Sequence, residues 1–236
     1  MEHIRIQWRL FAILAPLFIA FTIIGTVSHE CGHALAARYY GYNPHIAYNY
    51  TTYPMPHQER MDALRHRYGQ EIEERQVFPD SAFFWKEYRK TTAQDTVVTW
   101  GGPVQSMLTG TVGLAILLSQ WKRFKRAERL RTGQWLILFL ALFWLRPLSN
   151  FLISLPGWIS NGRFSTRSDE AFVALNYDLP VYSISAITAG MGLIAFGIVC
   201  LAIPGRQRAT FILSGLVGGL CGFMFWLKWI GPLVMP

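Results

Sequence analysis

Residues 10–33 read LFAILAPLFIAFTIIGTVSHECGH, an apolar run that ends in two histidines with a glutamate beside the first. The 19 residues at 10–28 carry no charge. An α-helix rises about 1.5 Å per residue, so roughly 20 apolar residues cross the hydrocarbon core of a bilayer. The run is longer than the apolar region of about 7–15 residues in a cleaved signal peptide. It therefore predicts a retained membrane-spanning helix.

The rest of the chain has the same apolar character. Of its 236 residues, 52% are hydrophobic and 15% are charged, whereas soluble domains usually have about 25% charged residues. Four more apolar runs follow, and the one at 133–155 is interrupted by Arg146 and Asn150. We predict one all-α polytopic membrane domain over residues 1–236, with a polar insert at 41–95. The predicted spans are 10–28, 96–120, 133–155, 182–205 and 209–230.

Basic residues cluster before the first span, in the loop 121–132 and in the turn at 206–208. With five spans, these three segments fall on one side of the membrane, and Lys and Arg mark the cytoplasmic side. The pattern predicts a cytoplasmic N-terminus in an integral protein of a prokaryotic inner membrane. The basic residues behind the net charge of +8 then serve to orient the chain in the membrane. We therefore expect the lipid bilayer, and no nucleic acid, as a partner.

The insert and the last span each contain a local pattern. Residues 45–53 are rich in Tyr and Thr and favour a strand, and residues 58–76 have helical apolar spacing. The aromatic residues at 83–88 are typical of a membrane interface. In the last span, Gly215 and Gly219, and Gly218 and Gly222, form two overlapping GxxxG pairs that predict tight helix packing.

The residues after the first span form an HExxH motif. On a helix, His29 and His33 are one turn apart on the same face, so both imidazoles can bind one zinc ion. Glu30 is placed to deprotonate a zinc-bound water and to pass the proton to a leaving amine. Ionisable groups at the end of an apolar span are costly and usually functional. The alternative is a hydrogen-bonded polar cluster that joins helices.

Catalytic zinc usually has three protein ligands. Asp169 lies after the third predicted span and returns to the membrane side of His29 and His33. It is the candidate third ligand, with Glu170 as the alternative, although Asp169 could instead cap the next helix. Arg146 and Asn150 are candidates for substrate binding or electrostatic support. Arg146 could also lie at the end of its span and extend to the interface.

Several of these motifs together resemble the site-2-protease class of intramembrane zinc metalloproteases. They are HExxH on a first membrane helix, Gly101-Gly102-Pro103 at the start of a later one, and a downstream aspartate. The resemblance implies one zinc per chain, held by the two histidines and Asp169, with Glu30 as the general base. It also implies that Gly101, Gly102 and Pro103 belong to the site and that 45–53 is an edge strand that holds extended substrate.

The chain departs from the pattern of that class at two positions. Ser106 stands where an asparagine is typical of the GGPxxN segment, and Asp169 is followed by Glu170 rather than by glycine. The insert 41–95 is also too short for a PDZ-like domain, which indicates a minimal, divergent member. We expect a protease that hydrolyses a membrane protein or peptide in or near the bilayer. The alternatives are a non-catalytic membrane scaffold and a metal-binding or transport protein.

Overall fold

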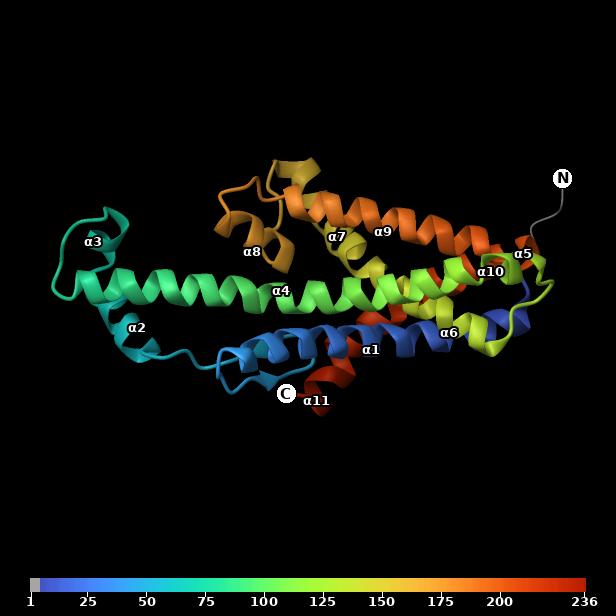
Figure 1. Cartoon of the computed structure of the whole chain (residues 1–236), viewed down its shortest axis with the longest axis horizontal. Helices are drawn as coiled ribbons and strands as arrows, with labels where there is room; N and C mark the ends of the chain where they lie inside the picture. The colour runs from blue at the N-terminus through green and yellow to red at the C-terminus, as the bar shows by residue number, and fades with distance from the viewer. Residues whose placement is uncertain (1–4) are drawn as a thin grey trace.

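The structure is a computed structural model that describes residues 5–236, and it is mostly helical (Figure 1). The prediction of an all-α fold is confirmed: in the described part of the chain, five helical segments are long and apolar enough to cross a membrane. These segments are α1 (Trp8–Tyr39), α4 (Ser81–Ser119), Thr132–Asn161, α9 (Ser183–Ala202) and Gly205–Val234. We therefore treat the chain as a multi-pass membrane protein.

The third segment is not one continuous helix, as the run 133–155 predicts. It consists of α6 (Thr132–Ala141), a 3-10 turn η1 (Leu142–Trp144) and α7 (Leu145–Asn161). Pro147 has no N–H to donate to the carbonyl of Phe143, which removes an α-helical hydrogen bond at this point. The break sets the direction of α7, which begins beside the HExxH end of α1 and carries Arg146 in its first turn.

Helix α1 packs between α4 and the last segment, which comprises α10 (Gly205–Met224), a π-helical turn η2 (Phe225–Ile230) and α11 (Gly231–Val234). Glycine permits the close approach of α10. A Cβ atom on Gly218 would overlap the Ala15 carbonyl oxygen, and one on Gly222 would lie 2.9 Å from the Cβ of Thr22. A Cβ on Gly219 would meet nothing within 4 Å. The Gly218–Gly222 pair is therefore the one that supports packing, as expected for a GxxxG contact.

We expect Gly218→Val to destabilise the bundle and Gly219→Val to leave its stability unchanged. Both substitutions change helix propensity equally, but only the first forces a side chain into α1. Overpacking of this kind costs about 1–3 kcal/mol. Thermal unfolding in detergent measures the difference, and equal melting temperatures for the two variants would contradict this packing.

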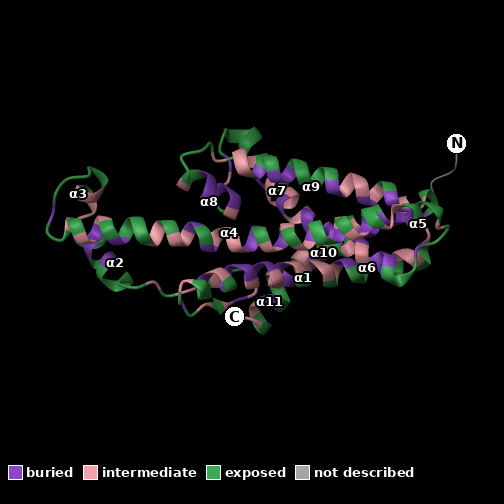
Figure 2. Ribbon diagram, viewed as in Figure 1, coloured by how far each residue is buried: buried purple, intermediate pink, exposed green. Residues whose placement is uncertain are grey.

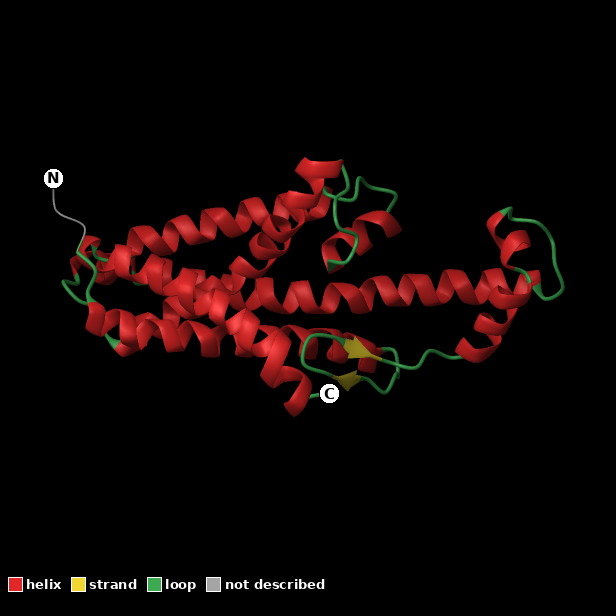
Figure 3. Ribbon diagram, turned by 180° about the vertical axis from the view of Figure 1, so that it is seen from behind, coloured by secondary structure: helices red, strands yellow, loops and turns green. Residues whose placement is uncertain are grey.

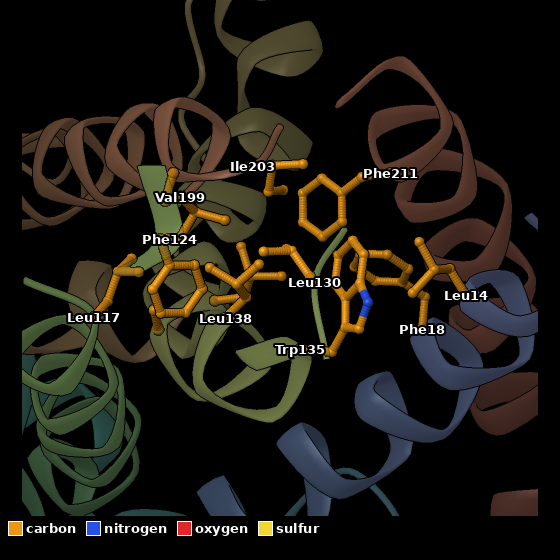
Figure 4. Close-up of a cluster of buried hydrophobic side chains, with 13 residues drawn as sticks. Leu14, Phe18, Leu117, Phe124, Leu130, Trp135, Leu138, Val199, Ile203 and Phe211 are labelled. Carbon is orange, nitrogen blue, oxygen red and sulfur yellow. The ribbon is translucent and has the colours of Figure 1, made fainter. Parts of the chain in front are cut away.

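A hydrophobic core joins the helices at the end of the bundle that holds the first turns of α1, α5 (Trp121–Arg126) and the start of α6. Figure 4 shows its buried side chains, among them Phe18 of α1, Trp135 of α6 and Phe211 of α10. The Phe18 and Phe211 rings lie 5.3 Å apart, and Trp135 stacks on Phe211 at 5.8 Å. This contact holds α1, α6 and α10 together and leaves the HExxH end of α1 to other partners.

The extramembrane insert differs from its prediction. Residues 45–53 do not form one strand but a small antiparallel hairpin of β1 (His45–Ile46) and β2 (Thr51–Thr52), drawn in yellow in Figure 3. The residues between the strands make the turn, in which the Ala47 N–H donates to the Tyr50 carbonyl at 2.9 Å. The hairpin lies against α1 and brings β2 to Glu30.

The predicted helix at 58–76 is divided at Tyr68 into α2 (Gln58–Arg67) and α3 (Gly69–Glu73). Helix α4 begins at Ser81, so residues 81–95 of the insert are the first turns of a 39-residue helix. Phe84, placed at a membrane interface by the sequence, is buried against α2 with Met61, Leu64 and Phe78. Figure 1 shows α2 and α3 at the far end of α4, beyond the bundle.

Candidate metal centre

The HExxH residues lie inside the protein, although they follow a lipid-facing run. His29, Glu30 and His33 are 1%, 3% and 8% exposed. Helix α4 packs against this face of α1, and α8 (Asp169–Asn176) packs on α4, where Figure 2 shows it largely buried. Three segments distant in sequence therefore meet at one site, in which the HExxH side chains are buried and Asp169 is partly exposed.

Glycine brings α1 and α4 together at this point. A Cβ on Gly32 would overlap the Gly101 carbonyl oxygen, and a Cβ on Gly101 would overlap the Gly32 carbonyl oxygen. A Cβ on Gly102 would overlap His33 Nε2 and lie 2.5 Å from His29 Nε2. Gly101 and Gly102 thus act through close approach, and Pro103 is buried beside them in α4. This placement gives the Gly-Gly-Pro sequence a part in forming the site, whereas contact with substrate stays a prediction.

The histidines direct the same ring nitrogen toward Asp169. Oδ2 of Asp169 lies 2.8 Å from His29 Nε2 and 3.4 Å from His33 Nε2. The side chains of His29, Glu30 and His33 also offer ligand atoms within 4.8 Å of one another. Two imidazole nitrogens and one carboxylate oxygen form a donor set that suits a catalytic zinc site with an open position. The residues present therefore fit a metal ion.

The other nitrogen of each ring is held by α4. His29 Nδ1 lies 3.0 Å from Ser106 Oγ, and His33 Nδ1 lies 2.9 Å from the Val98 carbonyl oxygen. The Gly102 N–H is also near His33 Nδ1, at 3.3 Å, but the shorter contact to a carbonyl requires an N–H there. A ring with its proton on Nδ1 has an Nε2 lone pair available to a metal ion, whereas a ring that carries a proton on Nε2 donates it to Asp169. Such outer contacts are typical of histidines that bind metal.

Asp169 and Glu170 are separated clearly by the structure. Ser168 caps α8, because its Oγ accepts from the Ala171 N–H at 3.3 Å, so Asp169 is not the cap. Glu170 is 1% exposed and accepts a hydrogen bond from Asn150 Nδ2 at 3.4 Å. Asn150 thus holds Glu170. Of the two acidic residues, Asp169 is the one whose carboxylate reaches both histidines.

The electrostatics of the two acids differ in the same way. Burial alone would raise the pKa of Asp169, but hydrogen bonds with His29 and His33 hold that pKa well below its usual range. Burial and the neighbouring Asp169 carboxylate raise the pKa of Glu170. Asp169 is therefore an anion at neutral pH, which suits a cation ligand.

Glu30 is fixed by residues that the motif alone does not identify. The Thr51 hydroxyl of β2 donates to Glu30 Oε2 and to the Glu30 backbone carbonyl, both at 3.1 Å. A guanidinium nitrogen of Arg146 lies 3.8 Å from Glu30 Oε1. Thr51 and Ser106 are the site residues that the motif does not reveal. Ser106 could be noticed in the sequence because it replaces the asparagine that is typical of the GGPxxN segment. No feature of the sequence indicates that Thr51 contacts Glu30.

A cavity of about 330 Å³ opens beside Glu30, His33 and Asp169. Its wall includes residues of the hairpin, of α4 and of α7, so it lies between the end of the bundle and the extramembrane insert. The other polar residues on the wall are Asn49, Tyr50, Thr51, Tyr53, Thr99, Arg146, Asn150, Arg167 and Ser168. A substrate in this cavity would contact Glu30, His33 and Asp169 together.

No protein-family model matches the chain, no curated protein matches its sequence, and no solved structure matches its fold. The function is therefore inferred from the site itself.

Proposed function

We propose that the chain is a zinc metalloendopeptidase of the site-2-protease type, which hydrolyses a membrane protein or peptide at the membrane boundary. The convergence of His29 Nε2, His33 Nε2 and Asp169 Oδ2, with Glu30 beside them in a cavity, carries the proposal. Asp169 is 140 residues from His29 in sequence. A polar cluster that only joined helices would not require a cavity beside its ionisable side chains, which are the groups that cost most free energy to bury in a membrane protein.

His29, His33 and Asp169 would hold one zinc ion per chain. When bound, the ion would supply a Lewis acid that polarises a carbonyl group and makes water more acidic. The Val98 carbonyl favours the His33 tautomer that carries its proton on Nδ1 and can bind the ion, and the Ser106 hydroxyl can accept the same Nδ1 proton from His29. Gly102 leaves the space between the two rings free of a side chain.

Glu30 would move the proton in the reaction. Hydrolysis joins the oxygen of water to the carbonyl carbon and breaks the C–N bond, giving a carboxylic acid and an amine. The Glu30 carboxylate would accept a proton from the attacking water and deliver it to the departing nitrogen. The Thr51 hydroxyl orients that carboxylate by donating to Oε2, which leaves Oε1 for the proton.

The position of the cavity supports a scissile bond near the membrane surface. The HExxH residues follow the uncharged run 10–28, and the hairpin that lines the cavity belongs to the polar insert. Figure 1 shows the start of α1, α5 and the start of α10 together at the other end of the bundle. These are the basic segments, so we propose a cytoplasmic N-terminus in a prokaryotic inner membrane, with the site near the opposite face.

Chelation tests this function most directly. We expect the purified protein in detergent to cleave an unfolded transmembrane peptide that carries its polar flanking residues. A zinc chelator should stop cleavage, and added zinc should restore it, since the three ligands are retained in the apo protein. Mass spectrometry of the products measures the cleavage. Cleavage that persists in chelator, or zinc-loaded protein that cleaves no peptide in a broad panel, would contradict the proposal.

A further inference from the structure

Arg146 is a half-buried cation whose hydrogen-bond donors lack partners. Among residues 5–236 no hydrogen bond joins its guanidinium to another group, and its Nε atom is fully buried without a partner. Its nearest counter-charge, Glu30 Oε1, is 3.8 Å away, which is too far for a hydrogen bond. A guanidinium has five N–H donors in a planar fork. An arginine held in this way is suited to an oxygen ligand that the protein itself does not provide.

The open side of Arg146 faces the candidate site. Its side chain is 25% exposed, and it lines the same cavity as Glu30, His33 and Asp169. The first turn of α7 places it there, after the break at η1. The exposed part of the Arg146 side chain therefore borders the space in which a substrate would meet Glu30.

Three other donors at the site are already engaged. The Ser106 hydroxyl donates to Gln105 Oε1, the Thr51 hydroxyl donates to Glu30, and the Asn150 amide donates to Glu170. Ser106 occupies the position at which the resemblance places asparagine, so the amide expected there is replaced by a hydroxyl that orients a histidine. A donor for a substrate oxygen must come from elsewhere on the wall.

We propose that Arg146 binds the carbonyl oxygen of the scissile peptide bond and the negative charge that develops on it. This inference rests on the proposed function. As the water oxygen bonds to the carbonyl carbon, the π electron pair of the carbonyl moves to its oxygen, and Arg146 N–H groups donate to that oxygen. When the carbonyl re-forms, the C–N bond breaks and the nitrogen leaves with the proton from Glu30. Donors aimed at such an oxygen act mainly in the transition state.

The test compares Arg146→Met with wild type in two measurements. We expect kcat to fall by roughly 10²–10³-fold with KM unchanged, which is the cost of losing one such donor. The second measurement is the affinity for a phosphinic analogue of the cleaved peptide, whose tetrahedral anionic centre replaces the carbonyl. That affinity should fall by a similar factor, whereas the affinity for the uncleaved peptide, measured in Glu30→Gln protein, should not change.

Two further variants separate this role from effects on the fold. Arg208→Met removes another arginine with a buried, unpartnered Nε, but at the far end of the bundle, and it should leave both measurements unchanged. Arg146→Lys keeps the charge without the fork, so it should recover part of the loss. Zinc content should be equal in all of these proteins. A lower zinc content in Arg146→Met would instead indicate that the residue holds the site together, which would overturn the assignment.

A double substitution decides whether Arg146 acts only through Glu30. If it did, Arg146→Met would not change analogue affinity in a Glu30→Gln background. We expect the loss to persist there, because the guanidinium contacts the ligand directly. Normal cleavage by Arg146→Met, or a loss that disappears in Glu30→Gln, would overturn the role of Arg146 alone. A wild-type protein that neither cleaves peptide nor binds the analogue would overturn the proposed function together with this inference.

Discussion

Glu30→Gln should abolish peptide cleavage while zinc remains bound. The amide keeps the size of the carboxylate and can still contact the Thr51 hydroxyl, which lies 3.1 Å from Oε2. It cannot accept a proton from water. Loss of a general base typically costs 10²–10⁴-fold, and we expect a loss of roughly that size or larger. Product formation and zinc per chain are measured on the same preparation.

Glu87→Gln is the matched control for this substitution. Glu87 is also a buried glutamate, at 8% exposure, but it lies on the part of α4 that precedes the site. We expect full activity from it. If Glu30→Gln cleaves as well as wild type, the carboxylate is not the base. A wild type that binds zinc without any cleavage would favour the non-catalytic scaffold or a metal-binding protein.

Asp169→Asn should have the largest effect on metal binding. The substitution replaces the carboxylate that contacts both histidines with a neutral amide. The low pKa of Asp169 indicates that the site favours the anion. Loss of an outer hydrogen-bond partner of a metal ligand costs about 10–100-fold in affinity. We therefore expect Ser106→Ala to fall in that range and Asp169→Asn to exceed it. Competition with a chelating dye measures both affinities.

Glu170→Gln provides the comparison next to Asp169. Its carboxyl group is held by Asn150 rather than by a histidine, so the amide should leave zinc affinity unchanged. The reverse result, with zinc lost in Glu170→Gln and retained in Asp169→Asn, would assign the third ligand to Glu170. Zinc retained in both would mean that neither acid is a ligand and that Asp169 only pairs with the histidines.

Much of the fold is predictable from the sequence because it follows from two properties of a single α-helix, its rise per residue and its repeat of 3.6 residues. At this rise, an uncharged run of about 20 residues is long enough to span a membrane, whatever packs against it. The repeat of 3.6 residues places His29 and His33 on one face of any helix that contains them. The proposed membrane orientation rests on the same local information, since Lys and Arg need only be counted by segment. None of these conclusions requires knowledge of packing.

The remaining features depend on contacts between distant segments. Asp169 and Glu170 are adjacent and chemically alike, and only the packing of α8 on α4 directs one toward the histidines and the other toward Asn150. Thr51 reaches Glu30 because residues 45–53 fold back as a hairpin. The break at η1 aims Arg146 into the cavity.

The sequence by itself thus determined the spans, their number and the pair of histidines, all of which follow from local helical geometry. Only the tertiary structure decided which acidic residue contacts the histidines and which residues surround Glu30, because the direction of a side chain in a folded chain is set by what packs against it.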